Sequence, residues 1–269
     1  MWAAAPRAPL PVARVSTLHS AAAGAARALS QVEAGRVRQR PAAIVFDKDG
    51  TLIDAHATWA PVLRRVQRRG FPGPEGGVLL ELLGLDDASG RFHGGAPFMI
   101  ETNATCSALL DERGFDGGAF YRLLNEDLDG GRALQVVSLC ATMLELFAEC
   151  RALGLRVAVL TADDRCNTES FLQREGLSVD AMVCGDDGRG CKPSREPLDA
   201  LARDLALPVE TLVMCGDSVH DVGSGVDARS WSVGVLTGVG TAATLSHADA
   251  VVDSVLDVPK LVEGWQRRC

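Results

Sequence analysis

The sequence Phe46-Asp47-Lys48-Asp49-Gly50-Thr51-Leu52 follows a short apolar run at residues 41–46, which predicts a buried strand. Asp47 and Asp49 stand two positions apart where that strand ends, and Gly50 belongs to the loop beyond it. Two neighbouring carboxylates raise each other's pKa unless a cation offsets their repulsion. Asp and Gly in isolation also favour an ordinary turn. The stretch therefore indicates either a turn or a charged site.

Segments far along the chain supply further polar groups at the ends of predicted strands. Thr161 follows residues 155–160, Lys192 lies in the loop after the next strand, and Asp217 and Asp221 follow a later one. Ligands of parallel sheets bind beyond the carboxyl ends of the strands. Carboxylates suit Mg²⁺, and a hydroxyl and an ammonium can hold phosphoryl oxygens. Together the segments favour the charged site over the turn.

Apolar runs and helical periods alternate over the second half of the chain. The predicted strands are residues 155–160, 181–184, 211–215, 231–236 and 250–252, and the predicted helices are residues 139–153, 165–175, 196–205 and 218–228. This alternation predicts an α/β fold with a parallel sheet and helices on both faces, a Rossmann-like core of three layers.

Residues 57–137 carry a different pattern, in which helical spacing is broken by glycines. The predicted helices are residues 57–69, 75–85, 96–113 and 119–128. We therefore expect a small helical domain at residues 57–137, inserted after the first strand. The core is then formed by residues 41–56 and 138–269.

Residues 1–40 differ from the rest of the chain in charge. They hold six Arg and one Glu, whereas residues 41–269 hold 21 basic and 34 acidic residues. An acid-poor start with Arg and Ser predicts a mitochondrial or chloroplast transit peptide, with a disordered tail and a cytoplasmic protein as the alternative. The acidic body disfavours nucleic acid as a partner. No apolar run approaches the roughly 20 residues that span a bilayer, so no membrane partner is expected.

Four motifs, in order, carry a resemblance to a known family. They are Phe46–Leu52, Val159–Thr161, Cys191–Pro193 and Gly216–Asp221, followed by the segment Gly234–Gly238. Over about residues 41–256 the chain resembles the haloacid dehalogenase (HAD) superfamily, in its phosphoglycolate-phosphatase-like branch. The helical segment between the first two motifs resembles the family's cap domain of the first type.

The resemblance implies a role for each motif residue. Asp47 would attack phosphorus and form an aspartyl-phosphate. Asp49 would protonate the leaving oxygen and then activate water. Thr161, backbone N–H groups near it such as that of Ala162, and Lys192 would hold the phosphoryl oxygens.

Mg²⁺ is the implied cofactor. Asp47, the backbone carbonyl of Asp49, and Asp217 would be its ligands, and Asp221 would bind it through water or orient Lys192. The implied substrate is a small phosphorylated metabolite similar to 2-phosphoglycolate, and the protein would act as a monomer or homodimer.

Single residues argue against two other activities of the superfamily. Asp49 argues against dehalogenation, because a departing halide needs no proton. Phosphonate cleavage needs a Schiff-base lysine in the cap, and residues 57–137 hold no Lys. A sugar-phosphate mutase and a non-catalytic scaffold that keeps the fold remain as alternatives.

Polar residues beside the motifs carry weaker expectations. Lys48 is expected to reach solvent or a surface acid, with added positive charge near the site as the alternative. Trp59 is expected to pack at the hinge, and His56 either packs there or touches substrate. The remaining expectations are a surface position for His220 and capping of the following helix by Asp163 and Asp164.

Overall fold

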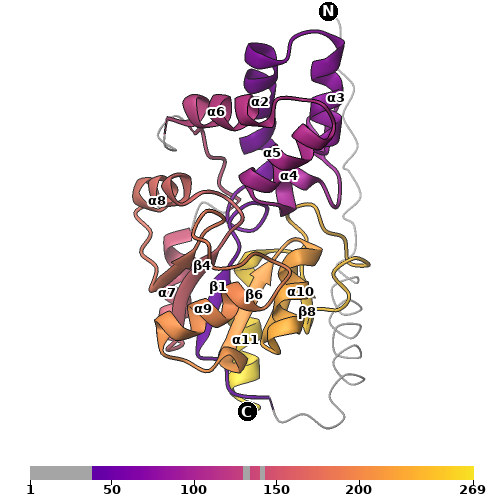
Figure 1. The fold of residues 1–269 in the computed structure, drawn as a ribbon. Coiled ribbons are helices and arrows are strands. Elements are labelled where there is room, and N and C mark those ends of the chain that lie inside the picture. The colour runs from indigo at the N-terminus through magenta and orange to yellow at the C-terminus, as the bar shows by residue number, and fades with distance from the viewer. Residues whose placement is uncertain (1–37, 130–133, 140–142) are drawn as a thin grey trace, which may run out of the picture. The chain divides into compact units, whose positions relative to one another are not determined.

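The protein's structure, a computed structural model, describes residues 38–129, 134–139 and 143–269. Its central feature is a six-stranded parallel sheet in the order β5-β4-β1-β6-β7-β8 (Figure 1). The strands are β1 (Ala43–Phe46), β4 (Arg156–Leu160), β5 (Ala181–Val183), β6 (Leu212–Gly216), β7 (Trp231–Val235) and β8 (Ala250–Val252). The predicted parallel sheet is confirmed, and the strand before Asp47 lies between β4 and β6.

Helices cover both faces of this sheet. Along β1, Ile44 and Phe46 join one apolar cluster while Ala43 and Val45 join another, because successive side chains of a strand point to opposite faces. The first cluster includes residues of α7 (Met143–Ala152), α8 (Arg165–Arg174) and α11 (Val258–Gln266). The second includes residues of α9 (Glu196–Leu205) and α10 (Val219–Ala228). This is the expected three-layer α/β core.

Between β1 and β4 the chain forms a helical insert, residues 55–128, with an apolar cluster of its own. Its helices are α2 (Ala55–Gly70), α3 (Pro74–Leu82), α4 (Pro97–Ile100), α5 (Asn103–Glu112) and α6 (Gly117–Leu128). Asp54 caps α2, since its Oδ1 accepts a hydrogen bond from the Ala57 N–H at 2.9 Å. Trp59, Phe98 and Phe120 are buried in the insert's cluster, so its helices are held by apolar packing as well as by caps.

The expected single helical stretch at residues 96–113 is wrong, because the chain breaks between α4 and α5. Glu101 is extended there, with φ −103° and ψ 162°. Thr102 caps α5, since its Oγ1 accepts a hydrogen bond from the Thr105 N–H at 3.2 Å. A hydroxyl that bonds the backbone in this way starts a new helix instead of continuing the old one.

The sequence pattern also misses four short elements and one helix. An antiparallel hairpin joins β2 (Leu85–Asp86) to β3 (Arg91–Phe92), and two 3₁₀ turns are η1 (Val209–Thr211) and η2 (Val255–Asp257). The hairpin explains why α3 ends before residue 85, and it also packs on His56. The His56 ring stacks on Phe92 and its Nδ1 accepts the Phe92 N–H at 3.1 Å, so His56 packs within the insert. The missed helix, α11, places Trp265 against Trp231 with 4.4 Å between ring centroids.

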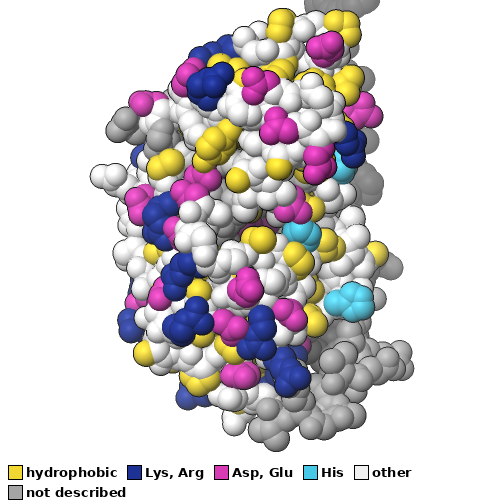
Figure 2. All heavy atoms as spheres, in the orientation of Figure 1, with side chains coloured by type: hydrophobic (Ala, Val, Ile, Leu, Met, Phe, Trp, Pro, Cys, Tyr) yellow, Lys and Arg dark blue, Asp and Glu magenta, His cyan; other side chains and the backbone are white. Residues whose placement is uncertain are grey.

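No helix in the described part of the chain is long and apolar enough to cross a membrane. Residues 1–37, which hold most of the predicted transit peptide, lie outside the described residues, as do residues 130–133 and 140–142. On the face shown in Figure 2, Lys and Arg side chains lie interspersed among Asp and Glu side chains. Opposite charges are therefore neighbours over much of that face.

Candidate active site

The carboxyl ends of three central strands bring polar side chains together. Asp47 follows β1, Thr161 follows β4 and Asp217 follows β6. Lys192 joins them from the segment before α9, and Asp221 from the first turn of α10. All five are buried, with at most 7% of any of them exposed. The structure thus gathers residues that four separate sequence motifs single out.

Lys192 links the first of these carboxylates to the last. Its Nζ donates to Asp47 Oδ1 and to Asp221 Oδ1, both at 2.6 Å. Burial alone would lower the pKa of Lys192, but Asp221 and Asp47 outweigh it and raise the pKa above its usual value. Burial raises the pKa of Asp47 to about 7, although Lys192 opposes this. Lys192 therefore stays charged, whereas full ionisation of Asp47 at neutral pH calls for a further cation.

Asp47, Asp217 and Asp221 form an acidic cluster, because each offers an oxygen within 4.8 Å of the others. Asp221 uses both oxygens: Oδ1 accepts from Lys192, and Oδ2 accepts from the Ser218 N–H at 2.9 Å and O–H at 2.6 Å. Asp47 and Asp217 each keep one oxygen with no recorded partner among the described residues. The cluster therefore fits a divalent cation held by Asp47 and Asp217, while Asp221 orients Lys192.

Two glycines make room for Asp217. A Cβ on Gly50, whose φ is +90°, would lie 2.5 Å from the Asp217 carboxylate, and one on Gly238 would lie 1.9 Å from its Oδ2. The Val239 N–H donates to the same Oδ2 at 2.7 Å. The segment that ends at Gly238 thus has a structural task, which is to hold Asp217 in place.

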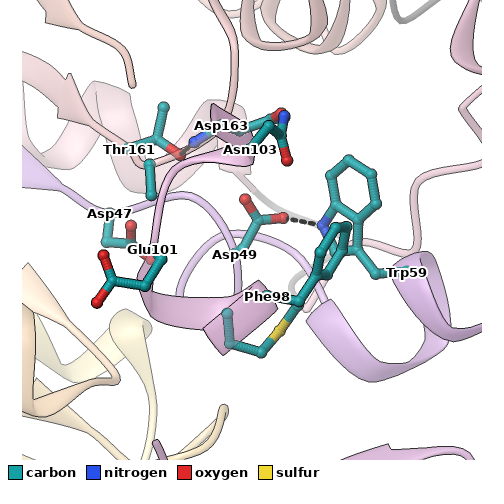
Figure 3. A pocket seen from close by; sticks show the side chains of 10 residues that line it. Asp47, Asp49, Trp59, Phe98, Glu101, Asn103, Thr161 and Asp163 are labelled. Atoms are coloured by element: carbon teal, nitrogen blue, oxygen red, sulfur yellow. Dashed lines mark hydrogen bonds between the residues drawn. The ribbon is translucent and has the colours of Figure 1, made fainter. Parts of the chain in front are cut away.

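Asp49 lies outside the acidic cluster. Its Oδ1 accepts the Trp59 Nε1–H at 2.5 Å (Figure 3). Its Oδ2 lies 2.7 Å from Lys48 Nζ. Trp59 is packed in the insert, as expected, and is in addition a direct partner of the second acid of the motif. Coordination of a metal by Asp49 through its backbone carbonyl stays a prediction.

Lys48 is fully buried, so the expectation that it reaches solvent is wrong. Its Nζ lies 2.7 Å from Asp49 Oδ2 and 3.0 Å from Asp163 Oδ2. Burial alone would lower the pKa of Lys48, but Asp163 and Asp49 raise it above its usual value. Asp163 also accepts the Asn167 side-chain amide at 2.9 Å through Oδ1. Asp163, expected as a helix cap, is therefore the counter-ion of Lys48.

Two further contacts join the insert to the core. Asp164 stands at the N-cap position of α8 but makes no side-chain capping bond; its Oδ2 instead accepts the Tyr121 hydroxyl of α6 at 3.1 Å. His220 is partly buried, and its Nδ1 lies 3.3 Å from the Ile100 carbonyl oxygen at the end of α4. Both residues therefore contact the insert, which the sequence pattern did not indicate.

A narrow cavity of about 20 Å³, room for one or two water molecules, lies beside Asp47 and Asp49 (Figure 3). The core lines it with Asp47, Asp49, Thr161, Ala162 and Asp163, and the insert lines it with Trp59, Phe98, Met99, Glu101 and Asn103. Thr161 Oγ1 accepts the Asp163 N–H at 3.1 Å and can donate its own hydrogen. No hydrogen bond of the Ala162 N–H to another described residue is recorded. The core side thus offers donors to an oxyanion next to Asp47.

Sequence reasoning missed the cavity residues at the break between α4 and α5, which are Phe98, Met99, Glu101 and Asn103. The apolar spacing of residues 96–113 predicts one uninterrupted helix and so does not reveal this break. The residue that could have indicated the break is Thr102, because threonine favours the N-cap position of a helix.

Comparison with known proteins agrees with this geometry. A family model described as haloacid dehalogenase-like hydrolase matches residues 41–229. The N-acetylmuramic acid 6-phosphate phosphatase of Pseudomonas putida is 28% identical over 230 residues, which are 82% of this chain and 96% of that protein. The pyrophosphatase PpaX of Bacillus velezensis is 26% identical over 225 residues, 82% of this chain and 95% of that protein.

A solved structure described as a haloacid dehalogenase-like hydrolase from Bacteroides fragilis has a TM-score of 0.64. It is 19% identical and covers 81% of this chain and 100% of its own, a likeness that shows the fold alone. The family match is stronger evidence, because it spans all four motifs from β1 to α10. This chain therefore belongs to the haloacid dehalogenase-like hydrolases.

Proposed function

We propose that this protein is a Mg²⁺-dependent phosphatase that hydrolyses a small phosphate monoester through a phosphorylated Asp47. The observation that carries the proposal is the pairing of Lys192 with Asp47 at 2.6 Å beside the Asp217 carboxylate. A nucleophile, a fixed cation and a candidate divalent-metal site lie together, and the nucleophile lines the cavity. The two phosphate-cleaving relatives add support from outside the structure.

The reaction has two steps. A carboxylate oxygen of Asp47 attacks phosphorus, and the bond to the alcohol oxygen breaks as Asp49 gives that oxygen a proton. Asp49 then takes a proton from water, whose oxygen attacks the phosphorus and releases phosphate and free Asp47. Lys192 offsets negative charge on Asp47 and the phosphoryl group, while the Thr161 hydroxyl and Ala162 N–H donate to phosphoryl oxygens.

Mg²⁺ would be held by Asp47 and Asp217, with the backbone carbonyl of Asp49 as a further ligand. When bound, it supplies positive charge that stabilises the phosphoryl oxygens. Asp221 acts on the reaction through Lys192, because both of its oxygens already have partners. Trp59 and Lys48 fix the direction of the Asp49 carboxylate.

The proposal is tested with the full chain, MgCl₂ and 4-nitrophenyl phosphate. Wild-type protein should release phosphate, and Asp47→Asn should lower kcat by at least about 1,000-fold because the nucleophile is lost. Asp253→Asn, which removes an exposed acid of the core, is the matched control and should keep wild-type turnover. Equal turnover by wild type and Asp47→Asn would contradict the proposal. A non-catalytic scaffold would show no turnover in either protein.

A further inference from the structure

The insert side of the cavity faces the alcohol that leaves with the phosphate ester oxygen. This follows from the proposed function, since Thr161, Ala162 and Lys192 engage the phosphoryl group on the core side. The insert side combines an apolar wall of Trp59 and Phe98 with the polar side chains of Glu101 and Asn103 (Figure 3). These residues are therefore the ones that can distinguish one alcohol from another.

Carboxylates dominate the charge of this cavity. The described residues that line it include Asp47, Asp49, Glu101 and Asp163 and no Lys, Arg or His. The nearby ammonium of Lys48 already faces two carboxylates, those of Asp49 and Asp163. A carboxylate on the leaving alcohol would meet like charge without an available cation in the cavity wall.

Glu101 is the carboxylate that the insert contributes. It stands at the extended break between α4 and α5 and is partly buried. The structure records no ion pair or hydrogen bond of its side chain with any other described residue. In Figure 3 it lies toward Asp47, within the same cavity. Its oxygens are therefore available to accept hydrogen bonds from a bound alcohol.

Asn103 offers the complementary group. Its side chain lines the cavity, only 7% of the residue is exposed, and its side-chain amide is hydrogen-bonded to Asp164. The amide nitrogen carries two hydrogens, so a ligand that accepts the one not directed at Asp164 is stabilised. The first residue of α5 thus presents an amide donor, two positions from the unpaired acceptor of Glu101.

We propose that this side selects the phosphate monoester of a small polyol and discriminates against an alcohol that carries a carboxylate. A hydroxyl group is both donor and acceptor, so it can donate to Glu101 and accept from Asn103. The faces of Trp59 and Phe98 pack against the carbon atoms. Glu101 and Asn103 are then specificity-determining residues, and the expected 2-phosphoglycolate becomes a poor substrate.

Two substrates of equal length test this directly. In 2-hydroxyethyl phosphate the far carbon carries a hydroxyl, and in 2-phosphoglycolate it is a carboxylate. Wild-type kcat/KM should favour 2-hydroxyethyl phosphate by at least about tenfold. Glu101→Gln should shrink this ratio at least about fivefold, mainly by lowering KM for 2-phosphoglycolate, and Glu101→Lys should invert it. Glu112→Gln makes the same charge change on the exposed face of α5 and should leave the ratio unaltered.

A second variant tests the amide. Asn103→Ala should raise KM for 2-hydroxyethyl phosphate by about three- to tenfold, as expected for one lost hydrogen bond. Thermal unfolding of each variant verifies that it is folded before its kinetics are compared.

The outcomes separate this inference from the proposed function. No wild-type turnover of 4-nitrophenyl phosphate would overturn the proposed function. Turnover of 4-nitrophenyl phosphate, together with equal or better use of 2-phosphoglycolate and an unchanged ratio in Glu101→Gln, would overturn the inference alone.

Discussion

The two sides of the cavity differ in how their polar groups are paired. On the core side, Lys192 contacts two carboxylates and Asp221 uses both of its oxygens. Lys48 is likewise held between two acids. On the insert side, the Glu101 carboxylate has no recorded partner among the described residues, and the Asn103 amide keeps a second N–H beside the one directed at Asp164.

This difference separates the reaction from the choice of substrate. Groups that are paired before substrate arrives have a fixed geometry and can serve any phosphate ester. Groups that are unpaired gain a partner only when a suitable alcohol binds, so their contribution depends on its chemistry. A family that shares one core can therefore act on different substrates by changing the residues of its insert.

The largest effect on stability is expected where the core side is most tightly paired. Lys48→Met leaves the buried carboxylate of Asp163 and the partly buried carboxylate of Asp49 without their cation. Removing one partner of a buried ion pair costs about 3–5 kcal/mol, since the other charge remains buried. We expect a loss of that size in the free energy of unfolding, measured by urea denaturation without Mg²⁺.

Two comparisons make this result specific. Adding Asp163→Asn to Lys48→Met should restore part of the loss, because one uncompensated charge is removed. Arg195→Met breaks the exposed pair with Asp199 and should cost far less than Lys48→Met, because solvent screens this pair. A Lys48→Met protein within about 1 kcal/mol of wild type would show that the pairing is not a stability determinant.

Sequence predicts the core side well because its chemistry follows from local rules. Apolar strands such as β1 and β6 end in Asp47 and Asp217, and parallel strands end at one edge. The burial of the Lys48 side chain could not be predicted from such local rules. Its charge indicates an exposed side chain, and its burial depends on Asp163, which lies more than 100 residues further along the chain.

The insert side resists prediction for a different reason. The spacing of apolar residues over 96–113 suits one helix, yet Thr102 caps a new one. This local competition between a side chain and the backbone shifts Glu101 and Asn103 into the cavity. The helix α11 is not predicted from the sequence pattern, because its packing depends on a distant contact, that of Trp265 with Trp231 of β7.

Binding of Mg²⁺ is expected to have a smaller, pH-dependent effect on the core side. Burial raises the pKa of Asp47 to about 7 and raises that of Asp217 well above its usual value. Folded pKa values above those of the unfolded chain favour folding at low pH. This contribution is lost as pH rises through about 7, as Asp47 ionises.

Mg²⁺ binds the ionised carboxylates, so its stabilisation should grow over the same interval. At pH 8 and a Mg²⁺ concentration of 100 times Kd, we expect the free energy of unfolding to rise by about 2.7 kcal/mol. At pH 5.5 and the same Mg²⁺ concentration, the rise should be less than half of that. Thermal unfolding with MgCl₂ or EDTA at both pH values measures it. Asp217→Asn should abolish the gain and Asp253→Asn should keep it, while an equal gain at both pH values would argue against these ligands.

The smallest effect is expected for a contact that joins the two sides without lining the cavity. Tyr121→Phe removes the hydroxyl that donates to Asp164 Oδ2 at 3.1 Å, and should lower the free energy of unfolding by about 1 kcal/mol or less. Since Tyr121 is absent from the cavity wall, kcat/KM for 2-hydroxyethyl phosphate and 2-phosphoglycolate should change by the same factor, below about threefold. Their ratio should therefore stay at the wild-type value, in contrast to Glu101→Gln. A change in that ratio as large as the one in Glu101→Gln would mean that selectivity depends on how the insert sits on the core, and the assignment of selectivity to Glu101 and Asn103 would have to be given up.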